Sequence, residues 1–413
     1  MGQAKSCEGE DKTSSGQCAA VDSPSTTEEE NLSKANITFT LDLFRSLGNQ
    51  NKSSNVSFSP LSVSAALSMV LLGAKGRTAD QMRECLKTKD CKDVHSSFAA
   101  LLKELNKTDP SYAVSIANRL YGEQSYEFIE MFLEGTREFY NAELETVDFI
   151  KKAEEARIQM NRWVEEQTQG KINESSGQRY CGQCSKVSVL VNAIYLKADW
   201  EKQFEKKKTR DAKFRLNKRQ TQTVKMMHQS GDFMLRKVKE ISCQVIEMFY
   251  TCELSMLIFL PNDIKDSTTG LEKLEQRLTY KSFVEWTRRD KMTLYEVDLR
   301  LPRFRIEQNY ELNEVLKTMG MEDAFDHCKC DFSGMSPAKD LMLSQAVHRA
   351  VVDVNEAGTE AAAATAAYMM LKCSLMYIPP PRATFNADHP FIFFIKHITT
   401  DTVLFAGRFC SEQ

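Results

Sequence analysis

The stretch Glu356-Ala-Gly-Thr-Glu-Ala-Ala-Ala-Ala-Thr-Ala-Ala-Tyr-Met-Met-Leu-Lys372 has almost no large side chain in its middle. Alternate positions from Thr359 to Ala367 are small and uncharged, whereas the other row contains Glu360 and Tyr368. In a β-strand the uncharged row can face inward while Glu360 faces solvent. With few apolar anchors, the same segment can also remain in solvent as a loop. A segment with two such states is a candidate conformational switch.

Composition alone also allows an alanine-rich helix, because Ala has the highest helix propensity. Gly358 and the β-branched Thr359 and Thr365 argue against that helix. Upstream, residues 347–355 form a run rich in β-branched side chains that predicts a strand. The flanking sequence on both sides therefore decides what the alanine-rich segment is.

Motifs spread over residues 30 to 410 are similar to those of the serpin family, in particular its intracellular, ovalbumin-like clade near the leukocyte elastase inhibitors. The motifs are Asn55-Val-Ser-Phe-Ser-Pro-Leu-Ser, Leu72-Gly-Ala-Lys-Gly-Arg-Thr, Ala117-Asn-Arg-Leu-Tyr-Gly, Asn161-Arg-Trp-Val-Glu, Val191-Asn-Ala-Ile-Tyr-Leu-Lys-Ala-Asp-Trp200 and Leu301-Pro-Arg-Phe. No single motif is decisive, but their order over nearly the whole chain is specific.

The 413 residues contain no Pro/Gly/Ser-rich linker between residues 30 and 410, which favours one large domain over several. Apolar periodicity predicts helices first and strands later, the order of an α+β fold. The helices are expected at 31–47, 60–72 and 151–171, and the strands at 187–196 and 254–260. The resemblance implies a single serpin-type domain over 31–413, with helices packed on large mixed β-sheets and an exposed reactive loop at about 356–384.

The first 30 residues differ from the rest in composition. They contain seven acidic and two basic residues and almost no large apolar side chain, which predicts a disordered, acidic, Ser/Thr/Gly-rich extension. The extension lacks the apolar core of a signal peptide. Gly2 and Cys7 fit a dual acylation pattern, so a membrane would be a partner only if both were acylated.

Charge and cysteine content limit the location and the partners. The net charge of −3 gives no case for nucleic-acid binding. Twelve cysteines without a signal peptide predict reduced thiols in the cytoplasm, with release to the extracellular space by a route without a classical signal. Cys181 and Cys184 form only a lone half-site, and Cys328 and Cys330 are too close in sequence for the usual zinc spacing. We predict no metal and no cofactor.

The sequence does not favour an enzyme. His348 and His389, together with the cysteines, invite a Cys-His hydrolase interpretation. However, the chain lacks a Gly-x-Ser-x-Gly elbow, a phosphate-binding Gly loop and a His-Glu-x-x-His motif. We expect its histidines to be structural hydrogen-bonding groups.

The resemblance implies a monomeric inhibitor that acts as a suicide substrate of serine proteases. The protease attacks the loop, and the cut loop then inserts into the main sheet as a new strand with the protease still attached. The hinge of this loop comprises Glu356, Gly358, Thr359, Glu360, Ala361, Ala362, Ala363, Ala364 and Thr365. A non-inhibitory serpin, acting in storage, interaction or as a chaperone, is the alternative; such members commonly carry charged or bulky residues in this hinge.

Counting along the family's loop places the reactive bond between Lys372 and Cys373. A Lys before the bond suggests trypsin-like proteases, whose specificity pocket holds an acid. The loop is longer here than in relatives, so Met370, Leu371 and Cys373 remain alternatives; the first two suggest chymotrypsin-like or elastase-like enzymes.

The resemblance also assigns a buried cluster that controls opening of the main sheet. Its members here are Ser59, Ser62, Asn192 and His348, with Trp200 near the top of the sheet where insertion begins. A fully satisfied polar network can exist in two discrete arrangements. Ordinary core polar groups are the alternative.

Two basic runs, at residues 206–210 and 288–289, are most simply solvated surface. Binding of a glycosaminoglycan or a nucleic acid is the alternative for both.

Overall fold

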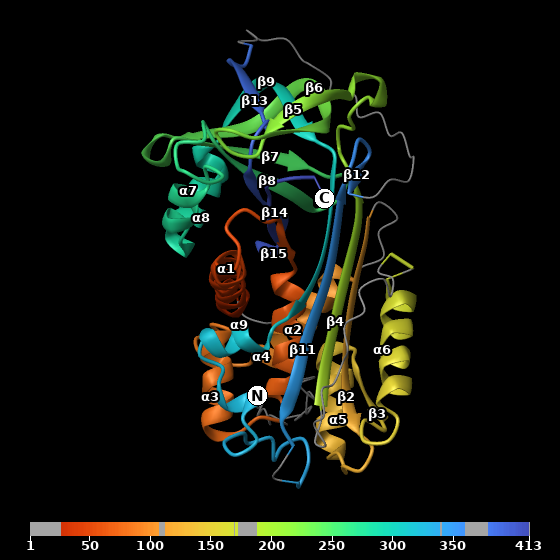
Figure 1. Ribbon diagram of the computed structural model, residues 1–413. Coiled ribbons are helices and arrows are strands. Elements are labelled where there is room, and N and C mark those ends of the chain that lie inside the picture. The colour runs from red at the N-terminus through yellow and green to blue at the C-terminus, as the bar shows by residue number, and fades with distance from the viewer. Residues whose placement is uncertain are drawn as a thin grey trace, which may run out of the picture.

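The structure is a computed structural model that describes residues 26–106, 112–168, 170–171, 188–338, 341–359 and 379–412 (Figure 1). Its helices lie mostly in the first 170 residues, as predicted. They are α1 (Thr26–Gly48), α2 (Pro60–Leu71), α3 (Gly76–Cys85), α4 (Val94–Leu105), α5 (Glu130–Tyr140), α6 (Ala153–Gln167), α7 (Glu272–Arg277), α8 (Tyr280–Thr287) and α9 (Asn313–Thr318). Short 3₁₀ turns are η1 (Lys206–Lys208), η2 (Lys239–Ile241), η3 (Arg289–Lys291) and η4 (Asp323–Phe325).

Within the described residues, the first sheet has six strands and runs along the long axis of the molecule (Figure 1). In spatial order they are β10 (Phe304–Glu311), β11 (Leu343–Val354), β12 (Gly358–Thr359), β4 (Ser188–Asp199), β2 (Tyr112–Glu123) and β3 (Glu143–Val147). The short β12 separates β11 from β4 only at one end. Over the rest of their length, β11 and β4 pair directly and in parallel.

The second sheet has nine strands, most of them antiparallel. Its path is β1 (Val56–Phe58), β15 (Thr402–Phe409), β14 (Phe391–His397), β8 (Leu254–Pro261), β7 (Cys243–Phe249), β6 (Thr221–Val238), β9 (Thr293–Pro302) and β13 (Arg382–Asn386), and β5 (Arg210–Arg215) pairs with β6. In Figure 1, β5, β6, β9 and β13 lie at the top of the molecule, and β7, β8, β14 and β15 follow below them towards its centre.

Helix α2 positions the centre of the fold. Ser59 caps its first turn by accepting a hydrogen bond from the Ser62 N–H, and Pro60 occupies the first helical position, where no N–H is needed. Every residue of α2 is buried. Apart from Ser62, Ser64 and Ser68 its side chains are apolar on all sides, because the helix lies inside the core, against β2, β4 and β15.

The long sheet is covered on its other face by α6, which lies beside β4 and β2 in Figure 1. Met160 and Val164 of α6 share a separate apolar core with Val191 of β4 and Val347 of β11. The sheet is therefore buried on both faces, which explains the nearly continuous apolar runs in its central strands.

The α+β, single-domain architecture is confirmed. Two boundaries were wrong. Helix α1 begins at Thr26, inside the segment predicted as a disordered extension, because Glu28 and Glu29 supply the acidic first turn that favours a helix N-terminus. Helix α6 ends at Gln167 rather than near Gly170. Within the described ranges, no helix combines the length and apolarity needed to cross a bilayer.

Candidate functional site

The start of the alanine-rich segment lies inside the long sheet. Thr359 of β12 is paired antiparallel with Val354 of β11 on one side and Ala198 of β4 on the other. Its side chain is completely buried, and its hydroxyl lies 2.8 Å from the hydroxyl of Tyr250. The predicted inward row of small residues thus faces inward at Thr359.

Trp200 and Tyr250 both form hydrogen bonds to this hinge. The Trp200 backbone N–H donates to the carbonyl of Ala357 at 2.8 Å, and its indole Nε1 donates to the carbonyl of Asn355 at 3.0 Å. The two aromatic rings stack, with centroids 4.3 Å apart. Trp200 therefore lies at the β12 end of the sheet, and its role where insertion begins remains a prediction.

Gly358 allows the backbone of the hinge to approach β4 closely. A Cβ at this position would lie 2.6 Å from Asp199 Cα and 2.9 Å from the Trp200 nitrogen, and closer still to the Ala198 carbonyl oxygen. These are backbone atoms that cannot move aside. Only glycine fits here while the hinge occupies the sheet.

Glu356 is tied to the segment that follows β4. Its carbonyl accepts from the Phe204 N–H at 2.8 Å, and its Oε1 accepts from the Thr209 hydroxyl at 2.7 Å. The Glu356 side chain is buried. A buried carboxylate is costly without hydrogen bonds, so the Thr209 contact stabilises the hinge in this position.

The predicted polar cluster lies where β11 and β4 pair directly in the sheet. His348 and Asn192 are direct cross-strand partners, and the His348 Nδ1 hydrogen bonds to Asn192 Oδ1. The His348 Nε2 accepts from the Ser59 N–H at 2.9 Å, so the ring is neutral with its proton on Nδ1. Complete burial lowers the pKa of His348 to about 3, consistent with this neutral state.

The Asn192 amide completes the network. Its Nδ2 donates to the Ser62 hydroxyl and lies 3.2 Å from the Ser62 carbonyl. The structure therefore brings Ser59, Ser62, Asn192 and His348 together beneath the sheet, with Trp200 in the separate group around the hinge.

Sequence reasoning missed two members of this cluster. Asn118 of β2 accepts from the Asn192 amide, and the Tyr310 ring of β10 stacks on His348 at 6.4 Å between centroids. Asn118 had a detectable signal, because it is a polar residue between Ile116 and Leu120 on the core-facing row of a strand. No sequence pattern indicated Tyr310, since its contact with His348 depends on the register between β10 and β11.

Several predicted residues lie outside the described part of the chain. They are Gly2, Cys7, Cys181, Cys184, Glu360, Ala361, Ala362, Ala363, Ala364, Thr365, Met370, Leu371, Lys372 and Cys373. The assignments made for them remain predictions.

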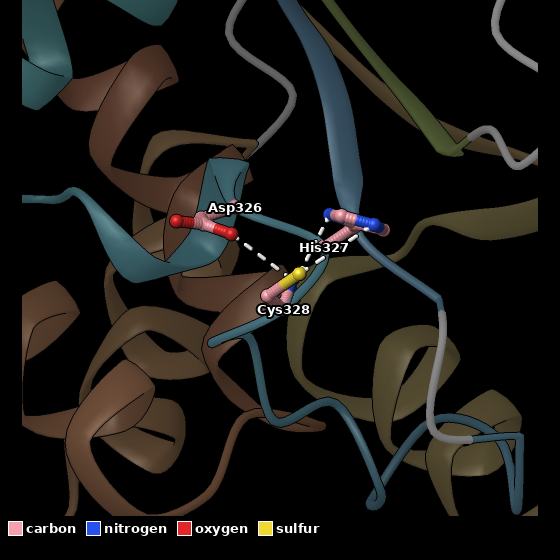
Figure 2. Close-up of side chains that lie close together, drawn as sticks. All are labelled: Asp326, His327 and Cys328. Carbon is pink, nitrogen blue, oxygen red and sulfur yellow. Dashed lines mark hydrogen bonds between the residues drawn. The ribbon is translucent and has the colours of Figure 1, made fainter.

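A second group of reactive side chains lies on a turn after η4, where His327 and Cys328 are exposed and Asp326 is half-buried. Figure 2 shows Asp326, His327 and Cys328, with the Cys328 sulfur 3.3 Å from His327 Nδ1. A Cys-His hydrolase needs a third group that orients the imidazole. Here the Asp326 carboxylate instead accepts from the Cys328 N–H at 2.9 Å and pairs with Lys329 at 2.9 Å. The arrangement does not support a catalytic pair.

His389, the other histidine considered for catalysis, is structural. It is buried, with Nε2 2.6 Å from the Pro261 carbonyl oxygen and Nδ1 2.7 Å from Asp388 Oδ1.

Comparison with known proteins identifies the class to which this fold and hinge belong. A family model described as serpin (serine protease inhibitor) matches residues 34–412. The leukocyte elastase inhibitor of Equus caballus is 47% identical over 383 residues, 92% of this chain and 100% of that protein. The inhibitor of the same name from Homo sapiens is 45% identical over the same shares of both chains.

Solved structures agree. The crystal structure of maspin has a TM-score of 0.84 at 32% identity, covering 94% of this chain and 100% of its own. Uncleaved ovalbumin has a TM-score of 0.82 at 33% identity, covering 92% and 100%. The chain belongs to the serpin family, within its ovalbumin-like clade. Membership of a family of protease inhibitors confirms the prediction that it is not an enzyme.

Proposed function

We propose that this protein inhibits serine proteases as a suicide substrate, by inserting its cleaved reactive loop between β11 and β4. The observation that carries the proposal is the buried Thr359, already paired with Val354 on one side and Ala198 on the other. A hinge that is already a strand supplies the nucleus for insertion. Small uncharged residues at 361–367 then let insertion outrun hydrolysis of the acyl-enzyme.

Insertion requires the parallel ladder between β11 and β4 to open. The ladder runs from the Leu343–Ser188 pair to the Val351–Tyr195 pair, and His348 and Asn192 bond across it. Each strand would exchange this parallel pairing for an antiparallel pairing with the loop, as β12 already has. We assign the cluster around His348 the role of gate, because separating the strands must break its hydrogen bonds.

Lys372 supports a trypsin-like protease as the target, since its ammonium group complements an acidic specificity pocket. A second candidate is an elastase-like or chymotrypsin-like target with cleavage after Met370 or Leu371. The similarity to proteins named leukocyte elastase inhibitors favours this second candidate. The two differ by only one or two residues in the position of the reactive bond.

The same proposal places a monomeric inhibitor in the cytoplasm, with release to the extracellular space by a non-classical route. Support comes from the resemblance to the ovalbumin-like clade. Membrane attachment would require acylation of both Gly2 and Cys7.

The test is denaturing gel electrophoresis after mixing the protein with trypsin, elastase or chymotrypsin separately, with mass spectrometry of the released C-terminal peptide. A denaturant-resistant complex with a cut after Lys372 supports the trypsin-like target. A complex with elastase or chymotrypsin and a cut after Met370 or Leu371 supports the second candidate. Cleavage by all three enzymes without any complex would contradict inhibition and favour a non-inhibitory serpin.

A further inference from the structure

The turn that contacts the hinge is unusually basic. Lys206, Lys207 and Lys208 of η1 are all exposed, and the exposed Arg210 follows Thr209. In the part of the chain that the structure describes, Lys207 and Lys208 pair with the neighbouring Glu205, at 2.9 and 2.5 Å. Since none of the three lysines is buried, packing does not explain why three cations stand together here.

Thr209, in the middle of this basic run, is the link to the hinge. Its hydroxyl donates to Glu356 Oε1 at 2.7 Å, and its side chain is half-buried. The Glu356 residue in turn lies two positions before Gly358 of β12. One hydroxyl thus joins an exposed Lys-rich turn to the inserted end of the reactive loop.

We propose that Thr209 is a phosphorylation site for a protein kinase with an acidic substrate groove, and that its phosphorylation releases the hinge from the sheet. Three lysines directly before a Thr and an Arg directly after it match the charge of such a groove. In the reaction, the Thr209 oxygen forms a bond to the γ-phosphorus of magnesium-bound ATP. The bond between the γ-phosphorus and the ADP leaving group breaks, and the catalytic carboxylate of the kinase accepts the hydroxyl proton.

The phosphate would act on the hinge through charge. It brings a charge of about −1.5 to −2 at neutral pH and removes the hydroxyl hydrogen that Glu356 accepts. Repulsion then opposes burial of the Glu356 carboxylate, while Lys206, Lys208 and Arg210 can hold the phosphate on the solvent side. Loss of a hydrogen bond to a charged group changes the hinge equilibrium by about tenfold or more.

The effect on inhibition rests on the proposed function. If the hinge leaves the sheet, insertion after cleavage must nucleate again, so more loops are hydrolysed before the protease is trapped. The phosphorylated protein should therefore consume more inhibitor molecules per protease trapped. Conversely, full insertion of a cleaved loop should hold Glu356 in place and slow phosphorylation.

The experiment treats the full chain with ATP–magnesium and the catalytic domain of a Lys/Arg-directed protein kinase. Peptide mass spectrometry locates the phosphate, and fluorescence of a Trp163→Phe/Trp286→Phe variant reports on Trp200, which donates to Asn355 beside the hinge. We expect phosphate on Thr209 and a change in Trp200 emission. That change should be smaller in a Glu356→Gln variant, where repulsion is absent.

Two matched variants test the role of the lysines. Replacing Lys206, Lys207 and Lys208 by Gln should slow phosphorylation of Thr209 by about tenfold or more, the factor that one lost charged contact produces. Replacing Arg288 and Arg289, the other basic run, should leave the rate unchanged.

Absence of phosphate from Thr209 in the folded chain would overturn the proposal, and so would Thr209 phosphorylation without any change in Trp200 emission. Neither readout uses a protease. A chain that shows both responses but traps no protease would contradict the proposed function and leave the phosphorylation switch supported.

Discussion

Thr359 is the residue at which the loop first enters the sheet, and it has no room for a larger or charged side chain. A Thr359→Arg substitution would bury an unpaired guanidinium between β4 and β11 and disturb the contact with Tyr250. We expect the variant to be cleaved by the target protease without forming the stable complex. Thr359→Ser keeps the hydroxyl and the small size, and should still form the complex. A stable complex with Thr359→Arg would refute the inward role of this row.

His348 makes stability depend on pH. Its pKa falls from 6.5 to about 3 on folding, so at intermediate pH the unfolded chain binds the proton more strongly. Stability is therefore retained above pH 6.5 and lost as the pH falls towards about 3. We expect this single group to remove about 1 to 2 kcal/mol between pH 6.5 and about pH 5.

Urea unfolding of the wild type and a His348→Gln variant at several pH values measures this effect, because the difference between them isolates His348 from carboxylates that titrate lower. A pH dependence that is identical in both proteins would show that His348 is not buried in its neutral form.

At the scale of elements, β12 depends on the absence of a side chain at Gly358. In Gly358→Ala the added Cβ would meet backbone atoms of Asp199 and Trp200, so β12 should leave the sheet. We expect altered Trp200 fluorescence and faster proteolysis around residue 358. Gly135→Ala in α5 is the control, because its Cβ would lie 3.6 Å from Leu72, an ordinary contact. Unchanged fluorescence and proteolysis in Gly358→Ala would contradict insertion of the hinge in the intact protein.

Strands and helices with strong local patterns were predictable from the sequence. The run at 187–196 became β4 and that at 254–260 became β8, because continuous apolar stretches are buried on both faces. Helix α2 was likewise visible in its cap and apolar composition. The contacts of the hinge were not predictable. Thr209 and Tyr250 meet Glu356 and Thr359 only through the tertiary fold, and no local pattern indicates such a meeting.

At the scale of the whole molecule, the proposed mechanism requires the long sheet to accept one more full-length strand between β4 and β11. Strands β4 and β11 are separated by β12 at one end and paired with each other below it. If the proposed mechanism holds, the intact form is less stable than the form with the loop inserted. Completing the central strand would bury the inward residues of the loop and add two antiparallel ladders in place of one parallel ladder.

The most direct test of insertion is the thermal unfolding midpoint before and after the reactive loop is cut by a protease that is not trapped. We predict that the midpoint rises by about 5 °C or more, since at an unfolding entropy of about 2.1 cal/mol/K per residue several kcal/mol of added stability raise the midpoint of a chain this long by about that amount. The peptide after the cut should remain bound until unfolding. A cleaved protein with an unchanged or lower midpoint would contradict loop insertion between β4 and β11.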